Sequence, residues 1–584
     1  MTPFGALAPS LFVLMVLVAT TRAQEQPASP ESPVPRLPRE PRDPRAPSTR
    51  SRPAQPLGVL QKRPGAQPGY TLIAPFNSGE TLLLDLDGAV VHQWHSEFPP
   101  GQSVELLDNG HLLRAARDPG ATSLRGGGEG GRIEEFDWDG NLIWSYVCCD
   151  EERRQHHDFE VLPNGNVLLI AWENKTSAEV VEVGRDLEAA RQGLRPDCLI
   201  EVKPTRPEGG TIVWEWHVWD HLIQDRDPTQ PNFGVVAEHP ERIDINALRR
   251  RDSALPQAMS PEEAERLRKL GYLGAEDESA GQGDGGRPPE EAPVPGSPEA
   301  ERLRSRMQDR GFGPMGGGID WNHLNSVAYH AGLDHLVMSS HNQHEVWIID
   351  HGTTTAEAAT GQGGKRGKGG DLLYRWGNPQ CWQAGDAAAQ QLFGQHDARW
   401  IEPGLRGAGH LLVFNNNVRR GAAMLGDRRR EQDREEGREP DWSFVVELEL
   451  PLQADGTYAR EAGKPFAPAT PFWRYGGGEG EARFESPIVS GSQRLQNGNT
   501  LITSGAEGYC VEVDAQGQVV WEFRSPFGRD TRDGPPEARG GRGGPPEARG
   551  GRGGMNSAFY RAIRFAPDHP AFKERELKPI RKPG

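Results

Sequence analysis

Alternating apolar and polar positions recur along the chain in the form that β-strands require. One segment type reads apolar, apolar, ring, any residue, aromatic, and it occurs six times. Alternation together with aromatic side chains predicts strands rather than helices. The six copies lie at residues 90–94, 142–146, 212–216, 372–376, 472–475 and 519–523.

A second repeating unit follows most of these copies, and it consists of two apolar strands joined by an Asn-Gly turn, as at Asn109-Gly110, Asn164-Gly165 and Asn497-Gly498. This dipeptide is a strong hairpin signal, because both turn residues need a positive φ. The shortest spacing between copies is about 48 to 52 residues, near the length of one four-stranded propeller blade. We therefore predict an all-β fold, a six-bladed β-propeller, in which residues 69–75 and 556–564 share the closing blade.

Composition divides the rest of the chain. A stretch rich in Pro, Arg, Ser and Glu predicts a disordered spacer, and a twice-repeated Gly/Pro/Arg-rich sequence predicts a flexible tether. The predicted organisation is a signal peptide (1–23), a Pro-rich disordered spacer (24–64), a catalytic propeller (65–530) with an insertion (220–318), a low-complexity segment (531–554), and a C-terminal strand and tail (555–584).

The insertion at 220–318 is expected to be partly helical. Ser260 is a candidate N-cap, with Pro261 at the first helical position and Glu263 at the third, which predicts a short helix through Leu270. A second Ser-Pro pair at residues 297–298 suggests another helix start. Two interpretations stay open, a lid over one mouth of the propeller and a disordered surface excursion.

The first residues predict export. An apolar run at 11–19 precedes the small-x-small cleavage site at 21–23, with no Lys or Arg before the run. The run is too short to span a membrane, so we interpret it as a secretory signal peptide and expect a periplasmic or secreted protein. No later segment has 18 apolar residues, so we expect no transmembrane segment in the mature chain.

Composition also narrows the function classes. Hydrophobic residues make up 35% of the 584 residues, beside 72 Gly and 50 Pro, so part of the chain is linker rather than core. A net charge of −17 disfavours a nucleic-acid partner, because the phosphate backbone would repel it. The five cysteines, including Cys148-Cys149, fit no zinc-ligand spacing. We expect one structural disulfide and buried thiols, and neither a metal nor a cofactor.

Histidine recurs at one point of the repeat, just before the hairpin unit of three consecutive blades. Loops at one mouth of a propeller bring residues of different blades together, so these segments are expected to share a polar site. A lone His-Asp pair more often closes a loop through a structural hydrogen bond, and the threefold occurrence is what favours a site. The segments are His156-His157-Asp158, His323-Leu324-Asn325 and Gln395-His396-Asp397.

Two kinds of chemistry suit clustered imidazoles. One is metal binding, although neither an HExxH motif nor a carboxylate-rich set accompanies these histidines. The other is nucleophilic catalysis, in which a neutral imidazole attacks a sulfuryl or phosphoryl group while His and Asn donors hold its oxygens. In that case Asp397 would hold His396 in the reactive tautomer, as the carboxylate of a catalytic triad does.

Several longer strings carry a family resemblance: Trp-Asp-His-Leu-Ile at 219–223, Trp-Asn-His-Leu-Asn-Ser at 321–326, Trp-Ile-Ile-Asp-His at 347–351, Leu-Tyr-Arg-Trp-Gly-Asn-Pro at 373–379, Gln-His-Asp-Ala at 395–398, and Ser-Gly-Ser-Gln-Arg-Leu-Gln-Asn-Gly-Asn-Thr at 490–500. Over about residues 69–526 the chain resembles the bacterial arylsulfate sulfotransferase family. The resemblance implies a six-bladed propeller that moves a sulfuryl group from an aryl sulfate ester to a phenolic acceptor. It also implies a ping-pong route without the nucleotide sulfate donor.

The resemblance implies site residues as well. His396 is the expected nucleophile and would form a sulfohistidine intermediate. The His-x-Asn pair of the family falls on His323 and Asn325. A further active-site histidine falls in the His156-His157 pair, where His157 is favoured and His156 stays open.

The sequence departs from the family pattern at one position. The better-known enzymes have an arginine eighteen residues after the His-x-Asn histidine, and His341 stands there in this chain. A protonated His341 would take over part of the neutralisation of the sulfuryl anion, and Arg474 and Arg494 are further candidates. Two other functions stay open: a non-catalytic exported propeller that binds a partner, and a metal-dependent hydrolase or lyase that uses the same histidines.

Overall fold

The computed structural model describes residues 56–120, 124–247, 320–416, 442–477, 484–528 and 557–580. The predicted signal peptide, both predicted helix starts of the insertion and the repeated low-complexity segment lie outside the described residues. The architecture below is that of the compact unit from Pro56 to Gly584. In the described part of the chain, no helix combines the length and apolar character needed to cross a membrane.

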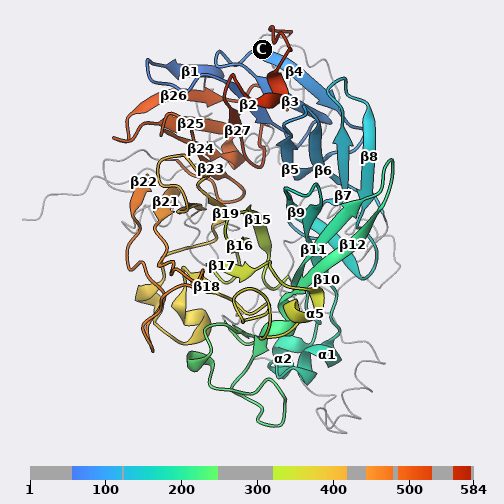
Figure 1. Ribbon diagram of the computed structural model, residues 1–584, viewed down its shortest axis with the longest axis vertical. Coiled ribbons are helices and arrows are strands. Elements are labelled where there is room, and N and C mark those ends of the chain that lie inside the picture. The colour runs from blue at the N-terminus through green and yellow to red at the C-terminus, as the bar shows by residue number, and fades with distance from the viewer. Residues whose placement is uncertain are drawn as a thin grey trace, which may run out of the picture. The chain divides into compact units, whose positions relative to one another are not determined.

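Six antiparallel sheets surround a common centre, as predicted, with β5, β9, β15, β19, β23 and β27 innermost (Figure 1). Blade one consists of β5 (Pro100–Leu106), β6 (Leu112–Arg117), β7 (Gly131–Phe136) and β8 (Leu142–Val147). Blade two consists of β9 (Arg153–Val161), β10 (Val167–Glu173), β11 (Asp197–Pro204) and β12 (Gly210–His217). Blade three consists of β15 (Leu324–His330), β16 (His335–Ser340), β17 (Glu345–Asp350) and β18 (Tyr374–Trp376).

Blades four and five and the closing blade complete the ring. Blade four consists of β19 (His396–Trp400), β20 (Leu411–Asn415), β21 (Phe444–Leu448) and β22 (Trp473–Tyr475). Blade five consists of β23 (Gly491–Arg494), β24 (Thr500–Ser504), β25 (Tyr509–Val513), β26 (Val519–Arg524) and β1 (Gly58–Lys62). The closing blade consists of β27 (Ile563–Phe565), β2 (Tyr70–Ile73), β3 (Glu80–Leu84) and β4 (Val90–His95). The all-β, six-bladed propeller predicted from the repeat is confirmed.

The repeated aromatic segments form the outermost strand of five blades, while β1 lies outside the aromatic strand β26 of blade five, and they join neighbouring blades. Five indole N–H groups each donate a hydrogen bond to a backbone carbonyl of the next blade, which satisfies the polar end of an otherwise buried ring. These donors and acceptors are Trp94 to Asp137, Trp144 to Gly209, Trp216 to Gly370, Trp376 to Pro468 and Trp521 to Leu86, at 2.7–3.0 Å. The repeat therefore encodes the contact between blades as well as the strand.

The hydrophobic core lies between the blades. Within the described residues, six apolar clusters occupy the six interfaces between neighbouring sheets. The interface of blades two and three, for example, packs Trp216 against Leu336 and Trp347. The middle strands of the blades bury most of their side chains, whereas the outer strands keep exposed positions, as on β8 and β12.

The two ends of the described chain close the ring together. β27 pairs with β2, with Tyr70 opposite Phe565, so the predicted sharing of the closing blade is confirmed. The predicted spacer boundary at residue 64 is wrong, because β1 pairs with β26 and adds a fifth strand to blade five. Val59 lies opposite Phe523 and packs on the adjoining core, so an apolar residue turns the end of the spacer into an edge strand.

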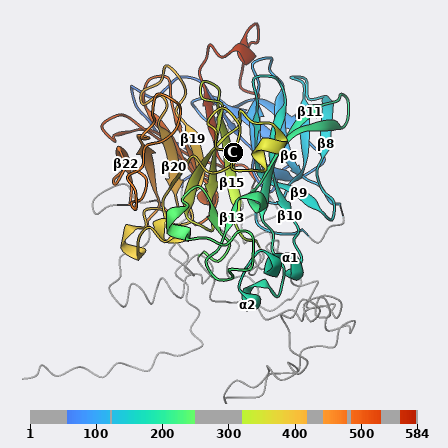
Figure 2. The same cartoon turned by 60° about the horizontal axis from the view of Figure 1, so that its bottom comes forward.

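The helices are short and lie in the connections between strands. In Figure 2, α1 and α2 lie below the strands of the ring, together with the segment around β13. The described start of the insertion holds two short strands and two 3₁₀ turns. The bounds are α1 (Ser177–Glu182), α2 (Leu187–Ala190), η1 (Val218–His221), β13 (Leu222–Ile223), η2 (Val236–Glu238), β14 (Ile243–Asp244), α5 (Thr355–Ala358), η3 (Pro379–Trp382), η4 (Ala387–Ala389), η5 (Gly505–Glu507) and η8 (Pro570–Phe572).

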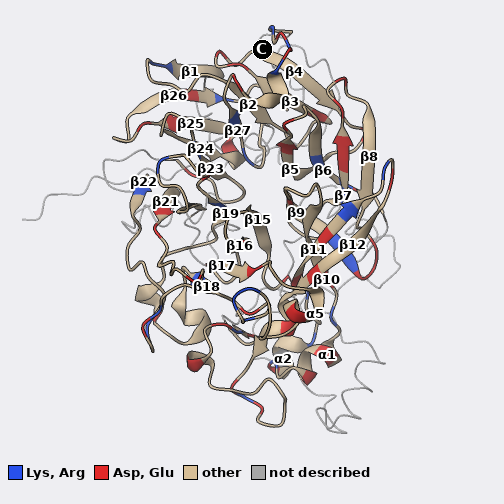
Figure 3. Ribbon diagram, viewed as in Figure 1, with Lys and Arg blue, Asp and Glu red and all other residues tan. Residues whose placement is uncertain are grey.

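Charge and sulfur chemistry add two findings. Acidic and basic segments are interspersed over the strands (Figure 3), so no blade is uniformly basic in that view. All five cysteines are free thiols, so the predicted structural disulfide is wrong. Cys148 and Cys198 lie in one apolar cluster, where they pack as small hydrophobic side chains.

Candidate active site

Five of the innermost strands have a residue with positive φ, either within the strand or just before it. His157, His323 and Asp397 have φ of 54°, 53° and 54°, and Gln102 and Ser490 have φ of 101° and 90°. His and Asp tolerate this conformation better than most residues, and such strained positions cluster at functional sites. The strand pairing skips Gln102, His157 and Asp397 at bulges in β5, β9 and β19. In β15 it skips Asn325, two residues after His323.

The predicted equivalence of the three histidine segments is therefore offset by one residue in blade four. His157 and His323 occupy the left-handed position of blades two and three, whereas Asp397 occupies it in blade four. His396 comes one residue earlier, at the first position of β19. This offset turns the imidazole and the carboxylate of blade four to different surroundings.

Four imidazoles form a continuous row across blades two, three and four. Ring centroids are 4.6 Å apart between His157 and His323, 5.2 Å between His323 and His341, and 5.2 Å between His341 and His396. The structure thus brings together the histidines that the sequence singled out. We refer to these four residues as the histidine row.

His396 is held in one tautomer. Its Nδ1 lies 2.8 Å from Asn416 Oδ1, while Asn416 Nδ2 donates to the carbonyls of Ser486 and Val489. Because the amide nitrogen is used for those carbonyls, the oxygen faces the ring and must accept a proton from Nδ1. The backbone N–H of Val489 then donates to Nε2 at 3.2 Å, which requires a lone pair there. Burial lowers the pKa of His396 to about 4, although the bond to Asn416 opposes the shift.

Asp397 does not orient His396, so that expectation is corrected. Its carboxylate accepts hydrogen bonds from Arg561, Arg399 and the Ser492 backbone N–H. The reason is the left-handed conformation of Asp397, which turns its side chain toward the ring centre. Asn416, from the end of blade four's second strand, takes the orienting role instead.

Arg561 connects three blades at the ring centre. It donates two hydrogen bonds to Asp158, at 2.8 and 2.9 Å, and one each to Asp397 and Ser103, both at 3.1 Å. Burial alone would lower the pKa of Arg561, but the two aspartates outweigh it and raise this pKa well above its usual value. Asp158 follows His157, and Asp397 follows His396, so Arg561 fixes the backbone beside two members of the histidine row.

His156 supports the row rather than joining it. Its ring stacks on Trp172 with centroids 4.2 Å apart, its Nε2 lies 3.0 Å from Asp197, and its Nδ1 lies 2.8 Å from His157 Nδ1. Burial, with His323 and His156 nearby, lowers the pKa of His157 well below its usual value. His157, which faces His323, is thus the better placed of the two for contact with a ligand.

His323 and His341 have different electrostatic settings. His323 Nδ1 lies 2.5 Å from the carboxylate of Asp320, which favours a charged or proton-donating imidazole. Burial, together with His323 and His396, lowers the pKa of His341 well below its usual value. This lowered pKa favours a neutral His341, and its expected role beside a sulfuryl anion stays a prediction.

The remaining predicted residues are placed as follows. Asn325 donates from Nδ2 to the Gln395 carbonyl at 2.8 Å, so it joins blade three to the residue just before His396. Its Oδ1 has no hydrogen-bond partner among the residues that the structure describes. Arg494 donates to Glu447 at 2.5 Å, and Arg474 stacks over Phe444 at 3.9 Å. Both arginines thus have partners of their own, Arg494 across blades five and four and Arg474 within blade four.

A glycine-rich loop lies against the row. Residues 126–131 include Gly128, whose carbonyl accepts a hydrogen bond from the His157 backbone N–H at 2.8 Å. A Cβ atom on Gly128 would lie 2.1–2.3 Å from three ring atoms of His157. The loop backbone therefore sits directly on the imidazole, at a distance that only glycine permits.

Several of these residues escaped the sequence analysis. Asp320 had a usable signal, since it stands three residues before His323. Asn416 had a weaker one, as part of an Asn run that ends an apolar strand. Asp197, Val489 and Arg561 had none, because they come from distant segments and meet the row only in the folded ring.

The sheets and the histidine row define a six-bladed β-propeller with a buried, imidazole-rich site at one end of its centre. An Arylsulfotransferase (ASST) family model matches residues 62–433. Because this match spans well over half of the chain, the protein belongs to the arylsulfotransferase family, and the family supports aryl sulfotransferase activity in general.

Solved structures give only distant matches. A protein of unknown function from Bacteroides caccae is 10% identical with a TM-score of 0.34, over 78% of this chain and 93% of that one. The periplasmic gluconolactonase of Pseudomonas aeruginosa is 10% identical with a TM-score of 0.32, over 77% of this chain and 94% of that one. Virginiamycin B lyase from Staphylococcus aureus is 7% identical with a TM-score of 0.30, over 80% of this chain and 88% of that one. TM-scores this low carry no argument here, and no curated protein sequence matches the chain.

Proposed function

We propose that this propeller transfers a sulfuryl group from an aryl sulfate ester to a phenol, through a covalent intermediate on His396 and without a nucleotide donor. The observation that carries the proposal is the state of His396. Its Nδ1–H is held by Asn416, and its Nε2 keeps a lone pair at the end of the histidine row. A neutral imidazole in this tautomer is the form that attacks an electrophilic sulfur.

In the first half-reaction, the Nε2 lone pair of His396 forms a bond to sulfur while the bond from sulfur to the aryl oxygen breaks. The leaving phenolate takes a proton from His323, whose Nδ1 is paired with Asp320. In the second half-reaction, His323 removes the proton of an acceptor phenol. That phenol's oxygen then bonds to sulfur, and the bond from Nε2 to sulfur breaks. The two steps make a ping-pong reaction.

Neutral donors are expected to hold the sulfuryl oxygens. The Val489 N–H donates to the Nε2 lone pair at 3.2 Å, so it must release Nε2 before sulfur bonds there, and it can then donate to a sulfuryl oxygen. Asn322, next to His323, is fully buried, and neither its amide nitrogen nor its oxygen has a hydrogen-bond partner among the described residues. Fixed donors in a water-poor site stabilise developing charge without reorganisation, which lessens the need for an arginine at position 341.

Export belongs to the same proposal. The apolar run at 11–19 and the small-residue site at 21–23 support a signal peptide, and we propose that the mature protein acts in the periplasm or outside the cell. Its substrates would then be small phenolic molecules met outside the cytoplasm.

The direct test is to quench the full-length protein after mixing it with an aryl sulfate donor alone. We expect a peptide containing His396 to gain about 80 Da, the mass of one sulfuryl group. Adding a phenol acceptor should remove the label and give steady turnover. His396→Ala should lose both label and turnover, whereas His95→Ala, at an exposed position on β4, should keep both. Turnover without a label on His396, or a label that stays in His396→Ala, would refute the proposed mechanism.

A further inference from the structure

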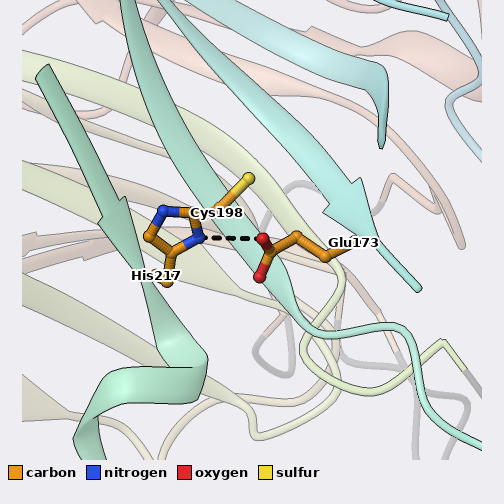
Figure 4. Close-up of side chains that lie close together, drawn as sticks. All are labelled: Glu173, Cys198 and His217. Atoms are coloured by element: carbon orange, nitrogen blue, oxygen red, sulfur yellow. Dashed lines mark hydrogen bonds and ion pairs between the residues drawn. The ribbon is translucent and has the colours of Figure 1, made fainter. Parts of the chain in front are cut away.

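A second group of potential ligands lies in blade two, outside the histidine row. Glu173 ends β10, Cys198 lies in β11 and His217 ends β12, so three neighbouring strands contribute one side chain each. Figure 4 shows the three side chains close together. The proposed sulfuryl transfer makes no use of them.

Strand register places the three side chains on the same face of the sheet. Cys198 pairs directly with His217 across β11 and β12, and with Ala171 across β11 and β10. Glu173 stands two residues beyond Ala171, and side chains two apart along a strand share a face. The backbone pairing therefore fixes the cluster, which does not depend on a chance meeting of flexible side chains.

The distances suit a metal ion after a small adjustment. One donor atom from each residue lies within 4.8 Å of the other two, and this is the one such set of three His, Cys, Asp or Glu among the described residues. His217 Nδ1 and Glu173 Oε1 are 2.9 Å apart. Ligand atoms around tetrahedral zinc lie about 3.3–3.8 Å apart, given bonds of about 2.0–2.3 Å. The His-Glu pair must open and the thiol must approach, each by roughly 1 Å or less.

The donor chemistry favours zinc over harder ions. A thiolate and an imidazole select Zn²⁺ over Mg²⁺ and Ca²⁺, and a thiolate with a carboxylate balances the charge of the ion. Glu173 Oε2 is buried and has no hydrogen-bond partner in the described part of the chain, and its ion pair with Lys175 is long, at 3.8 Å. A buried carboxylate oxygen without a hydrogen bond is costly, and a bound cation would remove that cost. His217 is partly exposed, which leaves an approach from solvent.

We propose that Glu173, Cys198 and His217 bind one Zn²⁺ ion, with water as the fourth ligand. On binding, the Cys198 thiol proton passes to solvent, the ion takes the place of the proton on His217 Nδ1, and the neutral ring carries its one proton on Nε2. The ion then joins β10, β11 and β12. The neighbour of Cys198, Asp197, contacts His156 Nε2 at 3.0 Å, so the ion also steadies the strand that supports the histidine row.

The test uses the purified full-length protein after treatment with a chelator. Zn²⁺ is titrated in competition with a chromogenic chelator, and Co²⁺ is used separately for its thiolate-to-metal charge-transfer band. We expect one equivalent of Zn²⁺, a charge-transfer band and a higher melting temperature with the ion. Cys198→Ser and His217→Gln should lose the band or shift it, and should weaken zinc binding by about 100-fold or more.

Cys510→Ser is the matched control, since Cys510 is a fully buried free thiol in β25 of another blade. It should bind zinc as the unchanged protein does. Absence of stoichiometric binding, or full binding in Cys198→Ser, would overturn the proposal. Loss of binding in His396→Ala with retention in Cys198→Ser would place the ion on the histidine row and also overturn it. None of these readouts depends on sulfuryl transfer, so the two proposals fail separately.

Discussion

Removing the hydrogen-bond acceptor of His396 tests whether its tautomer is set by the protein. Asn416→Leu keeps the approximate volume of the side chain but leaves the Nδ1–H without the acceptor that now lies 2.8 Å away. It also removes the donor to the Ser486 and Val489 carbonyls, at 2.6 and 3.0 Å. The ring is then free to place its proton on Nε2, where it cannot attack sulfur.

The expected magnitude follows from the cost of an unpaired buried donor, about 1–3 kcal/mol. At about 1.4 kcal/mol per factor of ten, kcat should fall by about 5- to 150-fold if that cost appears in the reactive form of His396. The bond from Val489 still favours the correct tautomer, so the loss should stay well below the about 10⁴-fold seen when a triad loses its orienting carboxylate.

The assay is steady-state turnover of an aryl sulfate with a saturating phenol, beside the melting temperature. Asn378→Leu is the matched control, because Asn378 is fully buried and bonds the Gln343 carbonyl and the Gln380 side chain in blade three. Both variants should lose comparable stability, and only Asn416→Leu should lose kcat. If Asn416→Leu keeps the kcat of the unchanged protein, or if both variants lose it equally, the tautomer argument is wrong.

Three further predictions concern the same site. Gly128→Ala should lower kcat at least tenfold by displacing His157, whereas Gly140→Ala, also at positive φ but with open space around it, should cost only about 1 kcal/mol of stability. Because burial lowers the pKa of His396 to about 4, turnover should hold near pH 5 and fall as the pH passes through 4. The contribution of His396 to stability should be full above about pH 6.5 and should decline as the pH falls toward 4, since the histidine protonates first in the unfolded chain. Arg561→Ala should lower the free energy of unfolding by about 3–5 kcal/mol in denaturant titration, because two buried aspartates lose their partner; a loss under 1 kcal/mol contradicts this.

The fold was predictable because its signal is local. Each blade carries its own aromatic outer strand and Asn-Gly hairpin, so six local patterns are enough to give the ring. The Pro-rich composition before residue 64 hid β1, since an edge strand needs only one apolar contact of the kind that Val59 makes. A strand of this kind is defined by its partner and not by its own sequence.

The site was only partly predictable because its members come from several blades. The histidines could be found, since each repeats a local position of the blade. The roles of Asp397 and Asn416 could not be read from the sequence, because a one-residue bulge decides which side chain faces the imidazole. The same limit hid the Glu173–Cys198–His217 cluster, whose members are far apart in sequence and meet through strand register.

Closure of the ring and assembly of the site are one event in this fold. Arg561 stands two residues before β27, and β27 reaches its place only when it pairs with β2 at the other end of the described chain. Until then, the buried Asp158 would lack its ion-pair partner and Asp397 would keep only Arg399, which is unfavourable. Pairing of the closing blade brings Arg561 to both aspartates and so fixes the backbone beside His157 and His396. A propeller with an open closing blade would therefore lack an ordered histidine row, even with the other five blades formed.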